Sequence, residues 1–233
     1  MVSNVNAVGF VLSLKCNAKC RHCAPRAGPD HQQQIASDDL CKWLDEAHSV
    51  GGMRVVVFSG GEPFLYPDLV KVITKSGKLF PNVHVLTNAF WATDPKTAKD
   101  VLSPLAAGGL TMLGISADDF HQEFVPIDRV RNAIAACRYY DLACTIQSVG
   151  HSKDSIKPDE LKCFRGKSEL ITRDTLPLGR ALDEKLPVKP AKPVHILESS
   201  ICSRAMEKEK NRPVPTVVPN GNVYGCDLAS FRS

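Results

Sequence analysis

The sequence predicts an α/β protein, a partial (β/α)6 TIM-like barrel with a short C-terminal β-hairpin appendage. Short β-rich stretches alternate with helical patterns as far as about residue 180. The stretch at residues 53–61 is nearly continuously apolar, which is typical of a strand buried on both faces of a parallel sheet. Successive β-α units favour right-handed crossovers, and therefore a parallel sheet that curls into an open barrel.

The first units can be followed along the chain. A β-rich stretch at residues 8–15 leads directly into a cluster of cysteines. The helix expected at residues 37–51 has Ser37 as its N-cap, acidic residues in its first turn and Gly51 as its stop. The elements that follow are the strand at 53–61, a helix at 66–80 and a strand at 82–88.

The same alternation continues and predicts three more strands. In such folds the groups that carry out chemistry gather at the C-terminal ends of the strands. The cysteine cluster follows the first strand, so we expect it at that edge of the sheet. The remaining elements are helix 94–109, strand 110–118, helix 127–141, strand 142–150, a short helix at 157–166 and strand 168–177.

The character of the sequence changes at about residue 183. Residues 184–194 contain three prolines in eleven positions and are typical of an extended linker. Beyond them, Asn220-Gly221 lies between β-forming residues and predicts a hairpin with a type I′ turn. We therefore expect a core barrel at residues 1–182 and a linker with a C-terminal segment at residues 183–233.

The composition excludes several classes of protein. Hydrophobic residues make up 43% and charged residues 23%, and the net charge of +4 is weak. Basic residues are spread along the chain, so we expect no nucleic-acid partner and no membrane-binding patch. No apolar run of about 18 residues occurs, and the N-terminus lacks a secretion signal. We expect a cytoplasmic protein whose nine cysteines are reduced, an odd number that suits metal ligation and buried thiols.

Cys16, Cys20 and Cys23 form a C-x3-C-x2-C loop with no fourth cysteine nearby. Structural zinc usually has four protein ligands in two separated pairs, and His22 as the fourth would strain a tetrahedral site. A [4Fe–4S] cluster is larger and can be wrapped by one loop with these spacings. Three thiolates leave one iron open to a ligand from outside the protein. The loop therefore favours such a cluster, with zinc as the alternative.

This loop resembles the C-x3-C-x-aromatic-C signature of the radical S-adenosylmethionine (SAM) enzymes, with His22 in the aromatic position. Gly60-Gly61-Glu62-Pro63 ends the second expected strand and resembles the family motif that binds the SAM amino group. The resemblance implies a [4Fe–4S] cluster on the three cysteines, with SAM on the open iron. Reductive cleavage of SAM then gives a 5′-deoxyadenosyl radical, which abstracts a hydrogen atom from the substrate. The glycines would let the backbone approach SAM, and Glu62 would accept from its ammonium group.

Polar residues at the ends of later strands resemble positions at which the family contacts SAM. Asn88 ends the third strand, and Ser116 and Asp118 follow the fourth, where polar groups reach the ribose or the methionyl part. Arg173, in the sixth strand, is a candidate for the SAM carboxylate or adenosine. The alternatives are ordinary turn capping for the first three residues and a surface position for Arg173.

The loop at residues 118–126 follows the fourth strand on the side of the expected active site. Asp119, His121 and Glu123 could supply a general acid or base, or hold a polar substrate. We take His121 and Asp119 as the candidate catalytic residues. The alternative is that His121 is a surface or structural residue.

The C-terminal segment resembles the opening half of a SPASM or twitch extension, which binds auxiliary [4Fe–4S] clusters. The resemblance rests on Cys202 and Gly221-x4-Cys226, with Gly179-Arg180 upstream, but the later cysteines of that pattern are absent. Three interpretations stay open: a degenerate twitch without a cluster, which we favour, a truncated chain, or a cluster with unusual ligands such as Cys163. The other cysteines, expected in the core, are Cys41, Cys137 and Cys144.

The resemblance implies an enzyme, and we expect it to act in peptide or natural-product tailoring. A small-molecule dehydrogenase or epimerase, acting on an amino sugar or nucleoside, is the alternative, and so is a non-catalytic iron–sulfur partner subunit. The expected partners are a peptide or small-molecule substrate and an electron donor such as flavodoxin or ferredoxin. Because only 15 residues precede Cys16, a peptide substrate would require a separate carrier protein.

Overall fold

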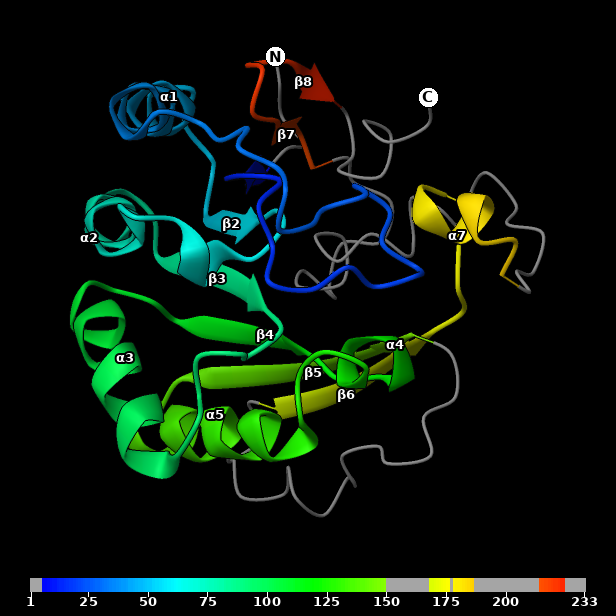
Figure 1. The fold of residues 1–233 in the computed structure, drawn as a ribbon. Helices are drawn as coiled ribbons and strands as arrows, with labels where there is room; N and C mark the ends of the chain where they lie inside the picture. The colour runs from blue at the N-terminus through cyan, green and yellow to red at the C-terminus, as the bar shows by residue number, and fades with distance from the viewer. Residues whose placement is uncertain (1–5, 150–167, 177, 187–213, 225–233) are drawn as a thin grey trace.

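The computed structural model describes residues 6–149, 168–176, 178–186 and 214–224, which form an open sheet with helices along its outer face (Figure 1). The strand order is β6-β5-β4-β3-β2-β1-β7-β8. All neighbours pair in parallel except β7 and β8, which form an antiparallel hairpin. The predicted α/β class, partial barrel and C-terminal hairpin are confirmed.

All six expected barrel strands are present, and each is shorter than its sequence pattern indicated. The first is the clearest example, because it ends at Val11 and the chain then turns into the cysteine loop. The strands are β1 (Ala7–Val11), β2 (Val55–Ser59), β3 (Asn82–Thr87), β4 (Met112–Ser116), β5 (Ala143–Val149), β6 (Ser168–Arg173), β7 (Thr216–Val217) and β8 (Val223–Tyr224).

The helices follow the predicted order, with short additional turns near the site. Ser37 is the first residue of its helix and not the N-cap, which is Ala36; the Ser37 hydroxyl instead accepts a hydrogen bond from Lys71. None of the helices in the described ranges is long and apolar enough to cross a membrane. The helical elements are α1 (Ser37–Ser49), η1 (Pro63–Leu65), α2 (Leu69–Leu79), α3 (Pro95–Ala107), α4 (Asp119–Gln122), α5 (Ile127–Tyr139) and α7 (Arg180–Asp183).

The burial of strand β2 on both faces explains why its sequence is apolar at successive positions. Val56 and Phe58 are fully buried in the large core between the sheet and the helices. Val55 and Val57 belong to a second apolar cluster with Ala7, on the opposite face of the sheet. Successive side chains of a strand point to opposite faces, so both faces of β2 are covered, as predicted.

The C-terminal hairpin extends the same sheet, because β7 pairs in parallel with β1. The predicted type I′ turn is wrong. That turn needs a positive φ at both central residues, and among the described residues only Gly221 of the Asn-Gly pair has one, at 81°. Pro219 supplies the preset φ of the turn instead, and the Gly221 amide donates to the Val218 carbonyl over 2.8 Å.

Several expectations concern residues outside the described ranges. These are the helix at 157–166 and the cysteines Cys163, Cys202 and Cys226. The division into residues 1–182 and 183–233 also stays a prediction. Of the cysteines expected in the core, Cys137 and Cys144 are buried and Cys41 is partly buried.

Candidate active site

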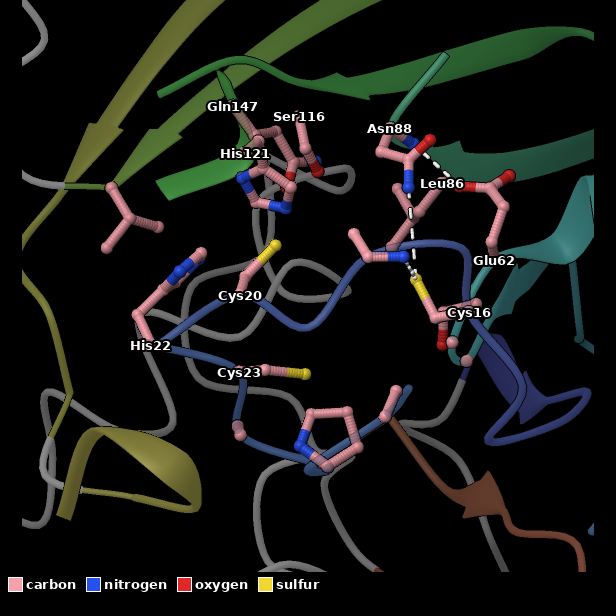
Figure 2. Close-up of a pocket in the computed structure, with 18 of the residues that line it drawn as sticks. Cys16, Cys20, His22, Cys23, Glu62, Leu86, Asn88, Ser116, His121 and Gln147 are labelled. Atoms are coloured by element: carbon pink, nitrogen blue, oxygen red, sulfur yellow. Dashed lines mark hydrogen bonds between the residues drawn. The ribbon is translucent and has the colours of Figure 1, made fainter. Parts of the chain in front are cut away.

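A pocket lies at the carboxyl edge of the parallel strands, where the cysteine loop leaves β1 (Figure 2). The predicted residues that line it come from four separate segments of the chain, at or after the ends of β1, β2, β3 and β4. Their convergence follows from the topology, because parallel neighbours place their carboxyl ends at one edge. The predicted residues in the lining are Cys16, Cys20, Cys23, Gly60, Gly61, Glu62, Asn88, Ser116, Asp118 and His121.

The three cysteines of the loop present their side chains to a common space (Figure 2). Cys16 is 8% exposed and Cys20 is 6% exposed. Burial raises the pKa of Cys16 to about 12, and it also raises the pKa values of Cys20 and Cys23 above the ordinary range for a thiol. Buried thiolates of this kind need positive charge beside them, which a bound metal centre supplies. The donor set therefore fits a thiolate-ligated iron–sulfur cluster.

The Gly-Gly-Glu-Pro turn is locked to the cysteine loop through the backbone. The Gly61 amide donates to the Ser13 carbonyl over 2.7 Å, and the Glu62 amide donates to the Lys15 carbonyl over 2.9 Å. A Cβ atom on Gly61 would lie 2.1 Å from the Lys15 carbonyl oxygen. The glycines are thus required for close packing against the cysteine loop, in addition to any contact with a ligand.

Glu62 is buried and connects this turn to the end of β3. One carboxylate oxygen accepts from the Phe64 amide over 3.1 Å and from the Thr87 hydroxyl over 2.7 Å. The other oxygen accepts from the Asn88 amide over 2.8 Å. Burial raises the pKa of Glu62 to about 7 in spite of these donors. A cation bound at the pocket would favour its charged form.

Asn88 reaches the cysteine loop with its side chain. Its Nδ2 donates to the Asn17 side-chain oxygen over 2.9 Å and lies 3.9 Å from the Cys16 sulfur. Its Oδ1 accepts from the Phe90 amide over 3.0 Å, so the turn-capping alternative also holds. The residue therefore stabilises its own turn and contacts the predicted cluster loop at the same time.

Asp118, His121 and His22 form a compact group in which one ligand atom of each lies within 4.8 Å of the others. Asp118 is the N-cap of α4 and accepts from the His121 amide, and its Oδ1 lies 2.9 Å from the His121 ring Nδ1. Burial alone would raise the pKa of Asp118, but the hydrogen bond and charge of His121 outweigh it and hold the pKa below its usual range. Burial lowers the pKa of His22 to about 4, so this ring is neutral at neutral pH.

Replacing Asp118 with asparagine is expected to destabilise the protein by about 1–3 kcal/mol at pH 7. The carboxylate accepts hydrogen bonds at two oxygens, whereas the amide has one acceptor oxygen and an NH2 group that can only donate. Asp118 also accepts from the Val149 amide over 3.1 Å, so the change leaves a buried donor without a partner. The folded-state pKa is depressed, so the contribution of the carboxylate is present above its ordinary pKa and is lost as the pH falls through the folded value. Urea unfolding of wild type and Asp118→Asn at several pH values measures the difference in their free energies of unfolding.

The matched control for that experiment is Asp119→Asn, one position along the chain. Asp119 is exposed, and its replacement should change the free energy of unfolding by less than about 0.5 kcal/mol. A difference between wild type and Asp118→Asn that grows in acid would contradict the assignment of Asp118 as a stabilising carboxylate.

Two predicted residues are placed differently from the rest. Asp119 is exposed, begins α4 and is not among the described residues that line the pocket. Arg173 ends β6, but its side chain lies outside what the structure describes. Ser116 ends β4 at the pocket, as expected.

Sequence reasoning missed several pocket residues, although the rule that found Asn88 and Ser116 would also have found some of them. Gln147 and Ser148 lie near the end of β5 and line the pocket. Asp174 follows β6 directly and lines it as well. Figure 2 shows Gln147 beside Ser116, on the side of the pocket opposite Cys23.

The family model described as the radical SAM superfamily matches residues 10–160, which is more than half of the chain. The chain belongs to the radical SAM superfamily. Members of this superfamily are enzymes that use a [4Fe–4S] cluster and SAM. The matched region contains both motifs on which the predicted resemblance rests, and the prediction of the family is confirmed.

Two curated relatives illustrate how far the similarity of this radical SAM protein extends. It is 25% identical over 134 residues to the putative peptide biosynthesis protein YydG of Bacillus subtilis, covering 57% of this chain and 42% of YydG. It is 29% identical over 145 residues to GTP 3′,8-cyclase of Clostridium acetobutylicum, covering 58% of this chain and 43% of the cyclase. The chain thus spans less than half the length of either relative.

The fold is similar to that of SuiB from Streptococcus suis. The crystal structure of SuiB bound to S-adenosylmethionine matches with a TM-score of 0.66 and 16% identity, over 97% of this chain and 61% of SuiB. SuiB bound to the precursor peptide SuiA matches with a TM-score of 0.64. At this identity the similarity establishes the fold alone.

Proposed function

We propose that Cys16, Cys20 and Cys23 ligate a [4Fe–4S] cluster, that SAM binds beside it in the pocket, and that the enzyme modifies a peptide. The observation that supports this most directly is the backbone contact between the Gly60–Pro63 turn and the cysteine loop, which brings both motifs to one edge of the sheet. When bound, the cluster and SAM supply one-electron cleavage of the sulfonium, and with it a radical that removes a hydrogen atom from the substrate.

The residues around the cysteines would hold SAM. The second Glu62 oxygen accepts only the Asn88 amide among the described residues and retains a lone pair for the SAM ammonium. Gly60 and Gly61 would add backbone carbonyls, and Asn88 would fix the orientation of Glu62 relative to the cysteine loop. The polar groups proposed for the ribose, the SAM carboxylate or the adenosine are Ser116 and Asp118, which line the pocket, and Arg173, which ends β6.

His121 is the proposed acid or base on the substrate side. Its Nδ1 is held by Asp118, so Nε2 is the ring nitrogen that remains for a substrate group. The carboxylate orients the ring, as the partner of a general base should. Asp119, one residue from Asp118, stays the second candidate for this role.

The descriptions of two similar proteins support a peptide substrate. YydG is described as a putative peptide biosynthesis protein, and SuiB binds a precursor peptide. A small-molecule substrate is the second candidate, because GTP 3′,8-cyclase is also similar, over 58% of this chain. We further propose cytoplasmic localisation, an electron donor such as flavodoxin or ferredoxin, and a separate carrier protein for the peptide.

Anaerobic reconstitution followed by reduction tests this function. We expect about four irons per chain, and release of 5′-deoxyadenosine when dithionite and SAM are added. Zinc in place of iron, or intact SAM after reduction, would overturn the proposal and favour a zinc loop or a non-catalytic subunit. About eight irons would indicate a second cluster involving the C-terminal cysteines. Mass spectrometry of a precursor peptide encoded beside the gene, compared with GTP as substrate, separates the two substrate classes.

A further inference from the structure

Arg180 is a buried arginine that contacts the cysteine loop at several points. The residue is 8% exposed in the described structure. Nη1 donates to the Cys20 carbonyl over 2.7 Å, and Nη2 donates to the Ala27 carbonyl over 2.7 Å. One guanidinium thus bridges two points of the loop on either side of Cys23, a geometry that the planar fork of arginine allows and a lysine ammonium does not.

The backbone of the same segment also lies against the loop. The Arg180 amide donates to the Cys23 carbonyl over 3.0 Å. The preceding Gly179 has a φ of 55°, and a Cβ atom there would lie 2.1 Å from the Ala24 carbonyl oxygen. Glycine is therefore required for the approach, and Gly179-Arg180 acts as a unit that fits against the cysteine loop.

The charge of Arg180 has no carboxylate partner among the described residues, since its terminal nitrogens bond to carbonyl oxygens. A buried cation without a counter-ion is costly. The nearby groups that can carry a negative charge are the three thiols and the exposed Asp183, which pairs with Arg26.

We propose that Arg180 is a positioning residue for the iron–sulfur cluster: it fixes the cysteine loop through the Cys20 and Ala27 carbonyls and offsets the negative charge of the thiolate ligands. This inference rests on the proposed cluster ligands. It links the segment after β6 to the cluster, since Arg180 stands 160 positions from Cys20. Among the described residues the buried guanidinium contacts carbonyl oxygens and no carboxylate, and in this proposal its counter-ion is the thiolate-ligated cluster.

Arg180→Gln and Arg180→Lys separate the two parts of this role. In the reconstituted full-length protein, Arg180→Gln should lose iron to a chelator about tenfold faster than wild type, the range found when groups that support metal ligands are removed. Its cluster should also have a more negative midpoint potential, because loss of a nearby positive charge disfavours the reduced state. Arg180→Lys should lose iron faster than wild type but keep a potential close to it. Redox titration followed by electron paramagnetic resonance measures the potential.

Asp183→Asn is the matched control. Asp183 pairs with Arg26, which also joins α7 to the cysteine loop, but both side chains are exposed. Its replacement should leave the iron content and the potential unchanged. Wild-type potential and wild-type iron retention in Arg180→Gln would overturn the role of Arg180 while leaving the proposed function intact. If Arg180→Gln does not fold, the test is made with Arg180→Lys. Wild-type iron retention in that variant would then overturn the role of Arg180 and leave the proposed function intact. Absence of iron from the wild type would overturn both.

Discussion

Replacing Cys16, Cys20 or Cys23 with serine is expected to abolish iron binding and SAM cleavage. A hydroxyl is a far poorer ligand for iron than a thiolate, and three of the four proposed cluster irons have a single protein ligand each. Changes to groups that only support metal ligands already cost 10–100-fold, so loss of a ligand should reduce 5′-deoxyadenosine release by more than about 100-fold. Iron should fall from about four per chain to less than about one. Iron analysis after anaerobic reconstitution and chromatographic measurement of 5′-deoxyadenosine give both values.

The matched control is Cys41→Ser, which makes the same one-atom change on helix α1. Cys41 is partly buried and is not among the residues that line the pocket. This variant should retain the iron and the activity of the wild type. Retention of iron by all three loop variants would contradict the ligand assignment, whatever happened to activity.

The sequence was sufficient for the parts of the site that depend on local patterns. The apolar stretch of β2 and the cysteine loop after β1 each fix a short segment, and parallel pairing then brings the two motifs together. The close contact between them could not be predicted. We expected the glycines to make room for a ligand, but a Cβ on Gly60 would lie 2.5 Å from the Ser13 carbonyl oxygen, which is backbone of the cysteine loop.

The contribution of Arg180 could not be predicted for a related reason. The sequence shows a Gly-Arg pair, but its contacts with Cys20 and Ala27 depend on where the chain passes after β6. His121 is an intermediate case. Its loop was predicted to lie at the site, and only the structure shows that its ring bonds to Asp118. Pairings within three residues depend on side-chain direction at a helix N-terminus, which spacing alone does not fix.

Replacing Gly61 with alanine is expected to disrupt both motifs at once. The added Cβ would lie 2.1 Å from the Lys15 carbonyl oxygen and 2.5 Å from its carbon, and these are backbone atoms that cannot rotate away. Lys15 immediately precedes Cys16, so relief of this clash moves the first cysteine of the loop. We expect SAM affinity and iron retention to fall by about tenfold or more, together with a loss of about 1–3 kcal/mol in the free energy of unfolding.

Gly28→Ala is the control that makes this result specific, because Gly28 lies in the same loop and its amide donates to the Leu14 carbonyl. A Cβ atom there has no neighbour closer than 3.9 Å, so alanine should be accommodated. Neither Gly28 nor Gly61 has a positive φ, and backbone strain therefore does not separate the two substitutions. Calorimetric titration of SAM into each reconstituted variant measures the difference. Equal SAM affinity in the two variants would mean that the contact between turn and loop is not what aligns the cysteines with the SAM site.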